Sequence, residues 1–135
     1  MKVVLDTNVL VSGIFYSGPP SEILRAWEQR KLRLVLTLPI FEEYKDVAVR
    51  LGVHFPAINI NRLMDLIIVE SDLCSPVALA RPVCTDPKDD KFIAAAIAGN
   101  AGVIISGDKH LLKVSGYHGI SVLSPRVFIE RFFND

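Results

Sequence analysis

The chain has 135 residues, and its 15 lysines and arginines balance its 15 aspartates and glutamates. Half of the residues are hydrophobic and 22% are charged. These values exclude an intrinsically disordered chain, which is poor in apolar residues and rich in net charge. They also exclude a generally basic coat for nucleic acid, because such a coat needs a large positive excess. The length predicts a single domain over residues 1–135.

Strand and helix patterns alternate along the chain. Short β-branched or leucine-rich runs predict strands at 2–5, 32–36, 103–105 and 120–123, with a shorter one at 77–79. Helical patterns cover 8–15, 21–31, 38–51, 58–70, 86–98, 108–113 and the segment after Pro125. This alternation predicts an α/β fold with three layers, α/β/α, around a central, mainly parallel sheet.

No segment predicts secretion or a membrane span. The apolar run after Met1 is too short for the core of a signal peptide. Residues 92–105 are the least polar stretch, but Gly99-Asn100 interrupts it and it falls short of the roughly 18 residues that a span needs. Cys74 and Cys84 lack the spacing of a zinc or redox motif. We therefore expect a soluble cytoplasmic protein with two free thiols.

Two predicted strands lead directly into aspartates. Asp6 follows the first strand, and Ser106-Gly107-Asp108 follows the strand at 103–105. Each aspartate could cap the helix that begins after it. Ligands of open α/β sheets, however, bind beyond the carboxyl ends of the strands, and two acids at strand exits favour a shared site there.

The segment Asp86-Pro87-Lys88-Asp89-Asp90 begins a predicted helix. Asp86 and Pro87 suit the N-cap and the first turn, and Asp89 lies where a capping box has its acid. Asp90 has no capping role and shares a face with apolar residues of the helix. Because a carboxylate on a core-facing surface is costly without a partner, we interpret Asp90 as functional.

The helix at 38–51 offers two further acids. Its apolar stripe contains Ile40, Tyr44, Val47 and Leu51. Glu42 lies nearly opposite the centre of this stripe, whereas Glu43 lies roughly 95° from it, at the edge of the core. Its position on the helix therefore favours Glu43 over Glu42 as a site residue. Taken alone, this position leaves a surface role for Glu43 open.

The candidate acids are Asp6, Glu43, Asp90 and Asp108. Converging carboxylates repel one another by about 1–4 kcal/mol per close pair, so a site of this kind needs a cation. No histidine or cysteine lies in the four motifs, and oxygen ligands alone favour Mg²⁺ or Mn²⁺ over Zn²⁺. An acidic cleft that holds Mg²⁺ suits phosphodiester hydrolysis.

In these motifs the sequence resembles the PIN domain, a family of metal-dependent ribonucleases that includes the VapC-like toxins of toxin–antitoxin pairs. The resemblance lies in Val4-Leu5-Asp6-Thr7-Asn8, Phe41-Glu42-Glu43-Tyr44, Asp86-Pro87-Lys88-Asp89-Asp90-Lys91-Phe92-Ile93 and Ile105-Ser106-Gly107-Asp108. It implies that Asp6, Glu43, Asp90 and Asp108 hold Mg²⁺ or Mn²⁺ and that Asn8 and Ser106 support them. Asp86 is a candidate for a peripheral ligand, with capping as its expected main role.

The resemblance also implies an RNA substrate, a small antitoxin partner, and a homodimer or higher oligomer. Lys88, Lys91, Lys109 and Lys113 flank the acidic motifs and are candidates for phosphate contacts. The phenylalanines at 128, 132 and 133 and the helices around Gly18-Pro19-Pro20 are candidates for apolar contacts with another chain. Two alternatives stay open: an RNA-processing nuclease without an antitoxin, and a catalytically inactive RNA-binding module.

Other α/β families with acids at strand ends fit less well. Asp6-Thr7-Asn8 lacks the second acid of a haloacid-dehalogenase-type phosphatase, and the adjacent acids of a receiver domain are missing. No glycine-rich phosphate loop occurs. The three histidines have no metal or triad spacing, so we interpret them as surface or loop residues.

Overall fold

The computed structural model describes residues 1–133. Within them, five parallel strands form one sheet in the order β3-β2-β1-β4-β5. The strands are β1 (Lys2–Leu5), β2 (Arg33–Leu36), β3 (Asp72–Leu73), β4 (Val103–Ile105) and β5 (Ser121–Leu123). Residues 3–5, 34–36 and 103–105 are all buried, as in parallel strands that helices cover on both faces. The predicted three-layer α/β/α fold is confirmed.

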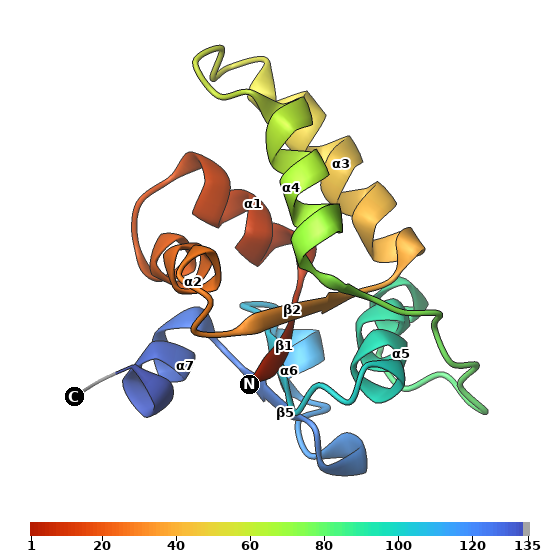
Figure 1. Cartoon of the computed structure of the whole chain (residues 1–135). Helices are drawn as coiled ribbons and strands as arrows, with labels where there is room; N and C mark the ends of the chain where they lie inside the picture. Colours follow the sequence, from red (N-terminus) through yellow and green to blue (C-terminus); the bar gives the residue numbers. More distant parts are fainter. Residues whose placement is uncertain (134–135) are drawn as a thin grey trace.

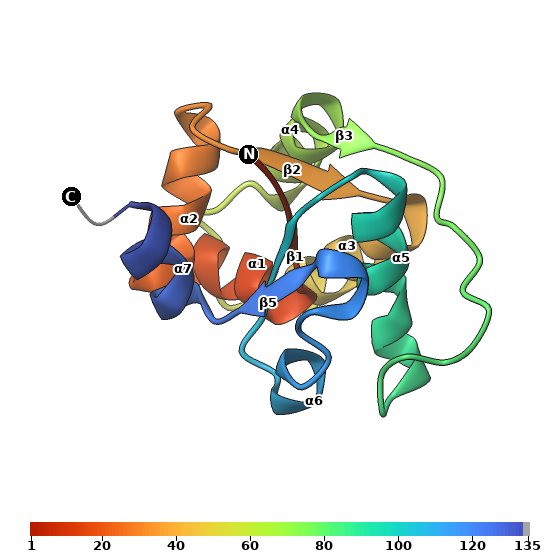
Figure 2. The ribbon, with the colours of Figure 1, turned by 90° about the horizontal axis from the view of Figure 1, so that it is seen from below.

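Helices cover the sheet on both sides. They are α1 (Thr7–Phe15), α2 (Pro19–Glu28), α3 (Leu38–Gly52), α4 (Ile60–Glu70), α5 (Asp90–Ala98), α6 (Lys109–Leu112) and α7 (Pro125–Phe132), with 3₁₀ helices η1 (Pro87–Asp89) and η2 (Tyr117–Gly119). Figure 1 shows α3 and α4 side by side above the sheet. Viewed from below, α1, α2 and α7 lie on one side of β1 and α5 lies on the other (Figure 2). None of the helices within residues 1–133 is long and apolar enough to cross a membrane.

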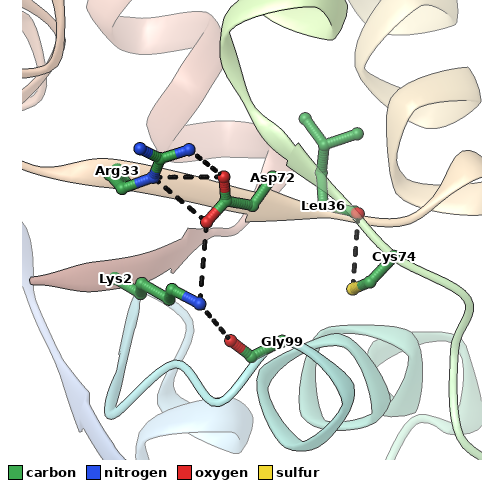
Figure 3. Close-up of polar contacts among 6 residues, drawn as sticks. All are labelled: Lys2, Arg33, Leu36, Asp72, Cys74 and Gly99. Atoms are coloured by element: carbon green, nitrogen blue, oxygen red, sulfur yellow. Dashed lines mark hydrogen bonds and ion pairs between the residues drawn. The ribbon is translucent and has the colours of Figure 1, made fainter.

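The edge strand differs from the prediction. Residues 77–79 form no strand, and the edge is instead the two-residue β3, which pairs with Val35 and Leu36 of β2. The Cys74 N–H donates to the Leu36 carbonyl at 3.0 Å. Polar side chains contribute to the pairing, because Arg33 forms an ion pair with Asp72, which also lies 3.7 Å from Lys2 (Figure 3). Polar contacts, rather than an apolar run, therefore hold this edge.

Two helices begin differently from the prediction. Helix α2 begins at Pro19, two residues before the predicted start, with Pro19 and Pro20 in its first turn. The predicted helix at 86–98 is divided into η1 and α5. Asp86 caps η1 through the Lys88 N–H, as predicted, but Asp89 makes no capping hydrogen bond, so the capping-box role expected for it is wrong.

Candidate functional site

The site lies where the strand order reverses. From β1 the chain proceeds towards β2 and β3, whereas from β4 it proceeds the other way, to β5. Such switch points are where open α/β sheets bind ligands. Leu5 pairs with Ile105, and the Asp6 N–H donates to the Ile105 carbonyl at 3.0 Å. This register places Asp6 beside Ser106 at the carboxyl edge of the sheet.

Asp6 is a buried carboxylate, only 6% exposed. One oxygen accepts hydrogen bonds from the N–H groups of Asn8 at 2.7 Å and Val9 at 3.2 Å, and therefore caps α1. The other oxygen accepts the Ser106 hydroxyl. Burial raises the pKa of Asp6, and the charge of Asp108 adds to that rise, while the hydrogen bonds oppose it. Asp6 thus both caps the helix and faces a second acid, so the two roles predicted for it are compatible.

Ser106 connects Asp6 to Asp108. Its hydroxyl is fully buried, donates to Asp6 and accepts the Asp108 N–H at 3.0 Å. Asp108 is half-buried and caps α6 by accepting the His110 N–H at 2.8 Å. One hydroxyl oxygen therefore contacts both the Asp6 carboxylate and the backbone of Asp108.

Glu43 leans over the edge of α3 as predicted, while Glu42 is exposed. One Glu43 oxygen accepts the Thr7 hydroxyl at 2.5 Å, and the other lies 3.2 Å from the Lys91 ammonium. Thr7 is 7% exposed and was missed by sequence reasoning, although its place directly after Asp6 was a usable signal. Asn8, the predicted amide helper, is exposed and contributes its backbone N–H to Asp6.

Tyr44 supports the site from beneath. It is buried, and its hydroxyl donates to the Leu5 carbonyl, one residue before Asp6. Burial raises the pKa of Tyr44, and the charges of Asp6 and Glu43 raise it further. The phenol therefore stays protonated and acts as a fixed donor that helps to place the end of β1.

Asp90 binds the backbone of the loop that precedes α5. Its carboxylate accepts the Cys84 N–H at 2.7 Å and the Val83 N–H at 3.2 Å. The backbone of the preceding loop is thus the partner that a core-facing carboxylate needs. Burial, the Asp90 carboxylate and the charges of Asp89 and Asp108 raise the pKa of the Cys84 thiol to about 12. The Asp90 oxygens therefore bind the loop that precedes α5.

Asp89 is an acid that sequence reasoning assigned to capping alone. It is half-buried at the start of α5, and among residues 1–133 no hydrogen bond holds its carboxylate. Burial raises the pKa of Asp89, and the charges of Asp108, Asp86 and Asp6 raise it further. Asp6, Asp89 and Asp108 therefore lie within electrostatic reach of one another, and Asp89 is an additional candidate for the site.

The donor set fits a hard divalent cation in its chemistry. Carboxylate oxygens are the ligands that Mg²⁺ and Mn²⁺ prefer, and the negative charge around buried Asp6 is of the kind that a cation relieves. Across residues 1–133, however, no three histidines, cysteines, aspartates or glutamates already surround one point as a metal cage would. Two of the four predicted acids are engaged elsewhere, Glu43 by Lys91 and Asp90 by the loop.

Comparison with known proteins agrees with this description. A family model described as PIN domain matches residues 2–110, which is well over half of the chain. The match includes Asp6, Glu43, Asp90 and Asp108. No curated protein matches the chain in sequence.

Proposed function

The chain belongs to the PIN domain family, whose members are generally nucleases that use divalent metals, and from that premise we propose a metal-dependent endoribonuclease. Its substrate is RNA, and its reaction is hydrolysis of a phosphodiester bond. The observation that carries the proposal is the pairing of Asp6 with Asp108 through Ser106 at the switch point of the sheet.

We assign Mg²⁺ or Mn²⁺ to Asp6, Glu43, Asp90 and Asp108, with Asp89 as an additional candidate. When bound, the cation supplies Lewis acidity and an activated water for phosphodiester hydrolysis. Ser106 holds Asp6 and the start of the Asp108 turn in place, and Thr7 orients Glu43. Exposed Lys88, Lys109 and Lys113 contact the phosphates of the substrate and position it without reading its sequence.

The test is cleavage of a labelled RNA in Mg²⁺, in Mn²⁺ and in EDTA. We expect Asp6→Asn to lower metal-dependent cleavage by more than about a hundredfold, because it removes a ligand charge. The folded variant should be as stable as the wild type or more so, since one buried repelling charge is gone. Glu42→Gln is the matched control, because Glu42 is the exposed neighbour of Glu43 and its loss changes the charge equally.

Equal cleavage by the wild type and Asp6→Asn would contradict the assignment. RNA binding without any metal-dependent cleavage would favour the alternative of a catalytically inactive RNA-binding module.

We further propose that the protein is the toxin of a type II toxin–antitoxin pair, in the manner of VapC-like proteins, and that it forms a homodimer. Induced expression of the wild type should arrest growth, and expression of Asp6→Asn should not. A small reading frame beside the gene whose product restores growth would support this role. Normal growth together with RNA cleavage in vitro would instead favour an RNA-processing nuclease. Light scattering of the purified protein tests the dimer.

A further inference from the structure

Lys91 occupies a position that the proposed reaction does not explain. Its ammonium lies 3.2 Å from one oxygen of Glu43, and the two side chains are only 23% and 37% exposed. The other ion pairs within residues 1–133 join Lys2 and Arg33 to Asp72, and Arg30 to Glu70. In the described part of the chain, Lys91 is therefore the cation that pairs with a predicted metal ligand.

The contact joins three elements at the edge of the site. Glu43 comes from α3, Lys91 from α5, and Thr7 at the start of α1 donates to the second Glu43 oxygen at 2.5 Å. Each oxygen of Glu43 thus has a partner within the protein. The Thr7 hydroxyl leaves a lone pair free on its oxygen, but the positive charge of Lys91 opposes a second cation at this carboxylate.

We propose that Lys91 is a built-in countercation for Glu43, which holds this carboxylate in the metal-free protein and releases it when a divalent cation binds. The inference rests on the proposed function, because it concerns the same acids. Two cations repel each other at a shared carboxylate, so the ammonium and a divalent cation compete for Glu43. Lys91 is in this sense a positioning residue and not a metal ligand.

The surroundings of Lys91 allow this release. The side chain borders a cavity of about 340 Å³ between α5 and the preceding loop, with Arg81, Pro82 and Asp90 among its other lining residues. The Lys91 ammonium also lies 5.3 Å from the centre of the Phe92 ring, a distance at which an aromatic face attracts a cation. An ammonium that leaves Glu43 therefore has open space beside it and keeps the Phe92 contact, while the Arg81 guanidinium on the same cavity limits how far it moves.

The test measures Mn²⁺ binding by electron paramagnetic resonance, without RNA. Lys91→Met keeps the length of the side chain and removes its charge. We expect it to bind Mn²⁺ about two- to fivefold more tightly than the wild type, the size expected of a partly exposed ion pair. Lys45→Met is the matched control, because Lys45 is exposed on α3 two residues from Glu43 and loses the same charge. The control should show a smaller change.

A second comparison tests whether Lys91 acts through Glu43. In a Glu43→Gln background, Lys91→Met should no longer tighten Mn²⁺ binding, because the competition has been removed. Unchanged or weaker binding by Lys91→Met overturns the inference, and so does an equal gain in Lys45→Met or in the Glu43→Gln background. If Lys91→Met does not fold, Lys91→Gln serves the same comparison.

The experiment also separates this inference from the proposed function. A wild-type protein that binds no Mn²⁺ overturns both. A wild-type protein that binds Mn²⁺ and cleaves RNA, while Lys91→Met gains nothing, overturns the role of Lys91 alone.

Discussion

Asp89 and Asp90 are neighbours in the chain, yet their carboxylates have different surroundings. The Asp90 carboxylate accepts two backbone N–H groups of the loop before α5, at 2.7 and 3.2 Å. The carboxylate of Asp89 is half-buried, and its pKa is raised by burial and by the charges of Asp108, Asp86 and Asp6. Asp90 therefore has hydrogen-bond partners within the fold, whereas Asp89 lies in an environment that favours a cation.

A pair of alanine variants distinguishes these environments. We expect Asp90→Ala to lower the free energy of unfolding by about 1–3 kcal/mol, because two backbone donors lose a charged acceptor. Asp89→Ala should leave the stability of the metal-free protein unchanged or raise it, since it removes a repelled charge, and should weaken Mn²⁺ binding. Urea unfolding in EDTA and Mn²⁺ titration measure the two effects. Equal losses of stability in both variants would contradict this distinction.

At the residue scale, the sequence predicted the exposure of the acids on α3 better than it predicted the contacts of Asp89 and Asp90. Helical periodicity correctly placed Glu43 at the core edge and Glu42 in solvent. It could not find the partner of Asp90, because residues 83–84 belong to a loop without periodicity. The capping-box role predicted for Asp89 is wrong because η1 precedes α5. A 3₁₀ turn advances by about 120° per residue instead of about 100°.

At the scale of elements, the end of α5 packs directly against β2. A Cβ added to Gly99 would lie 2.3 Å from Cγ1 of Val35, which is too close for any side chain. Gly99→Ala should therefore lower the free energy of unfolding by about 1–3 kcal/mol through overpacking. Gly102→Ala is the matched control, because nothing lies within 4 Å of its added Cβ, and it should change stability by less than about 0.5 kcal/mol.

A double variant identifies the cause of the Gly99 effect. If the clash with Val35 is responsible, Gly99→Ala should cost at least about 1 kcal/mol less in a Val35→Ala background than in the wild type. Additive losses would mean that the backbone of Gly99, and not its lack of a side chain, is what the fold requires. Chemical denaturation of the four proteins measures this coupling.

The edge strand β3 gives a prediction about pH. The guanidinium of Arg33 holds the pKa of Asp72 below its ordinary value of 3.8, chiefly through hydrogen bonding. A lowered carboxyl pKa means that this contact stabilises the fold at higher pH, and that the stabilisation is lost as the pH falls through the lowered pKa. Asp72→Asn should therefore be slightly less stable than the wild type near neutral pH and should approach it in acid. A difference that persists at low pH would contradict this role.

The same strand shows why part of the fold was not predictable. Strands β1, β2 and β4 carry buried apolar runs, and the sequence located each within two residues. Strand β3 has two residues, one of them charged, and owes its register to the Arg33–Asp72 ion pair and to the bond from Cys74 to Leu36 (Figure 3). Contacts between residues almost 40 positions apart leave no local pattern to read.

At the scale of the whole molecule, the zero net charge conceals an uneven distribution. Acids gather at the carboxyl edge of the sheet, where the charge of Asp108 contributes to the raised pKa of Asp6 and of Asp89. Apolar exposure is also uneven. Val53 of the α3 C-terminus and Val69 of α4 are 76% and 75% exposed, whereas Phe128, a predicted contact residue, is fully buried and Phe132 is 43% exposed. The α3–α4 pair, more than the C-terminal helix, therefore presents apolar side chains to solvent.

The link from Ser106 to Asp6 spans 100 positions of the chain. A ribosome that synthesises this protein translates a hundred codons between Asp6 and the partner hydroxyl of Ser106. Fragments that end before β4 lack both Ser106 and Asp108, so premature termination yields a chain without the paired acids. The proposed metal site therefore cannot assemble until Ser106 and Asp108 have both been translated.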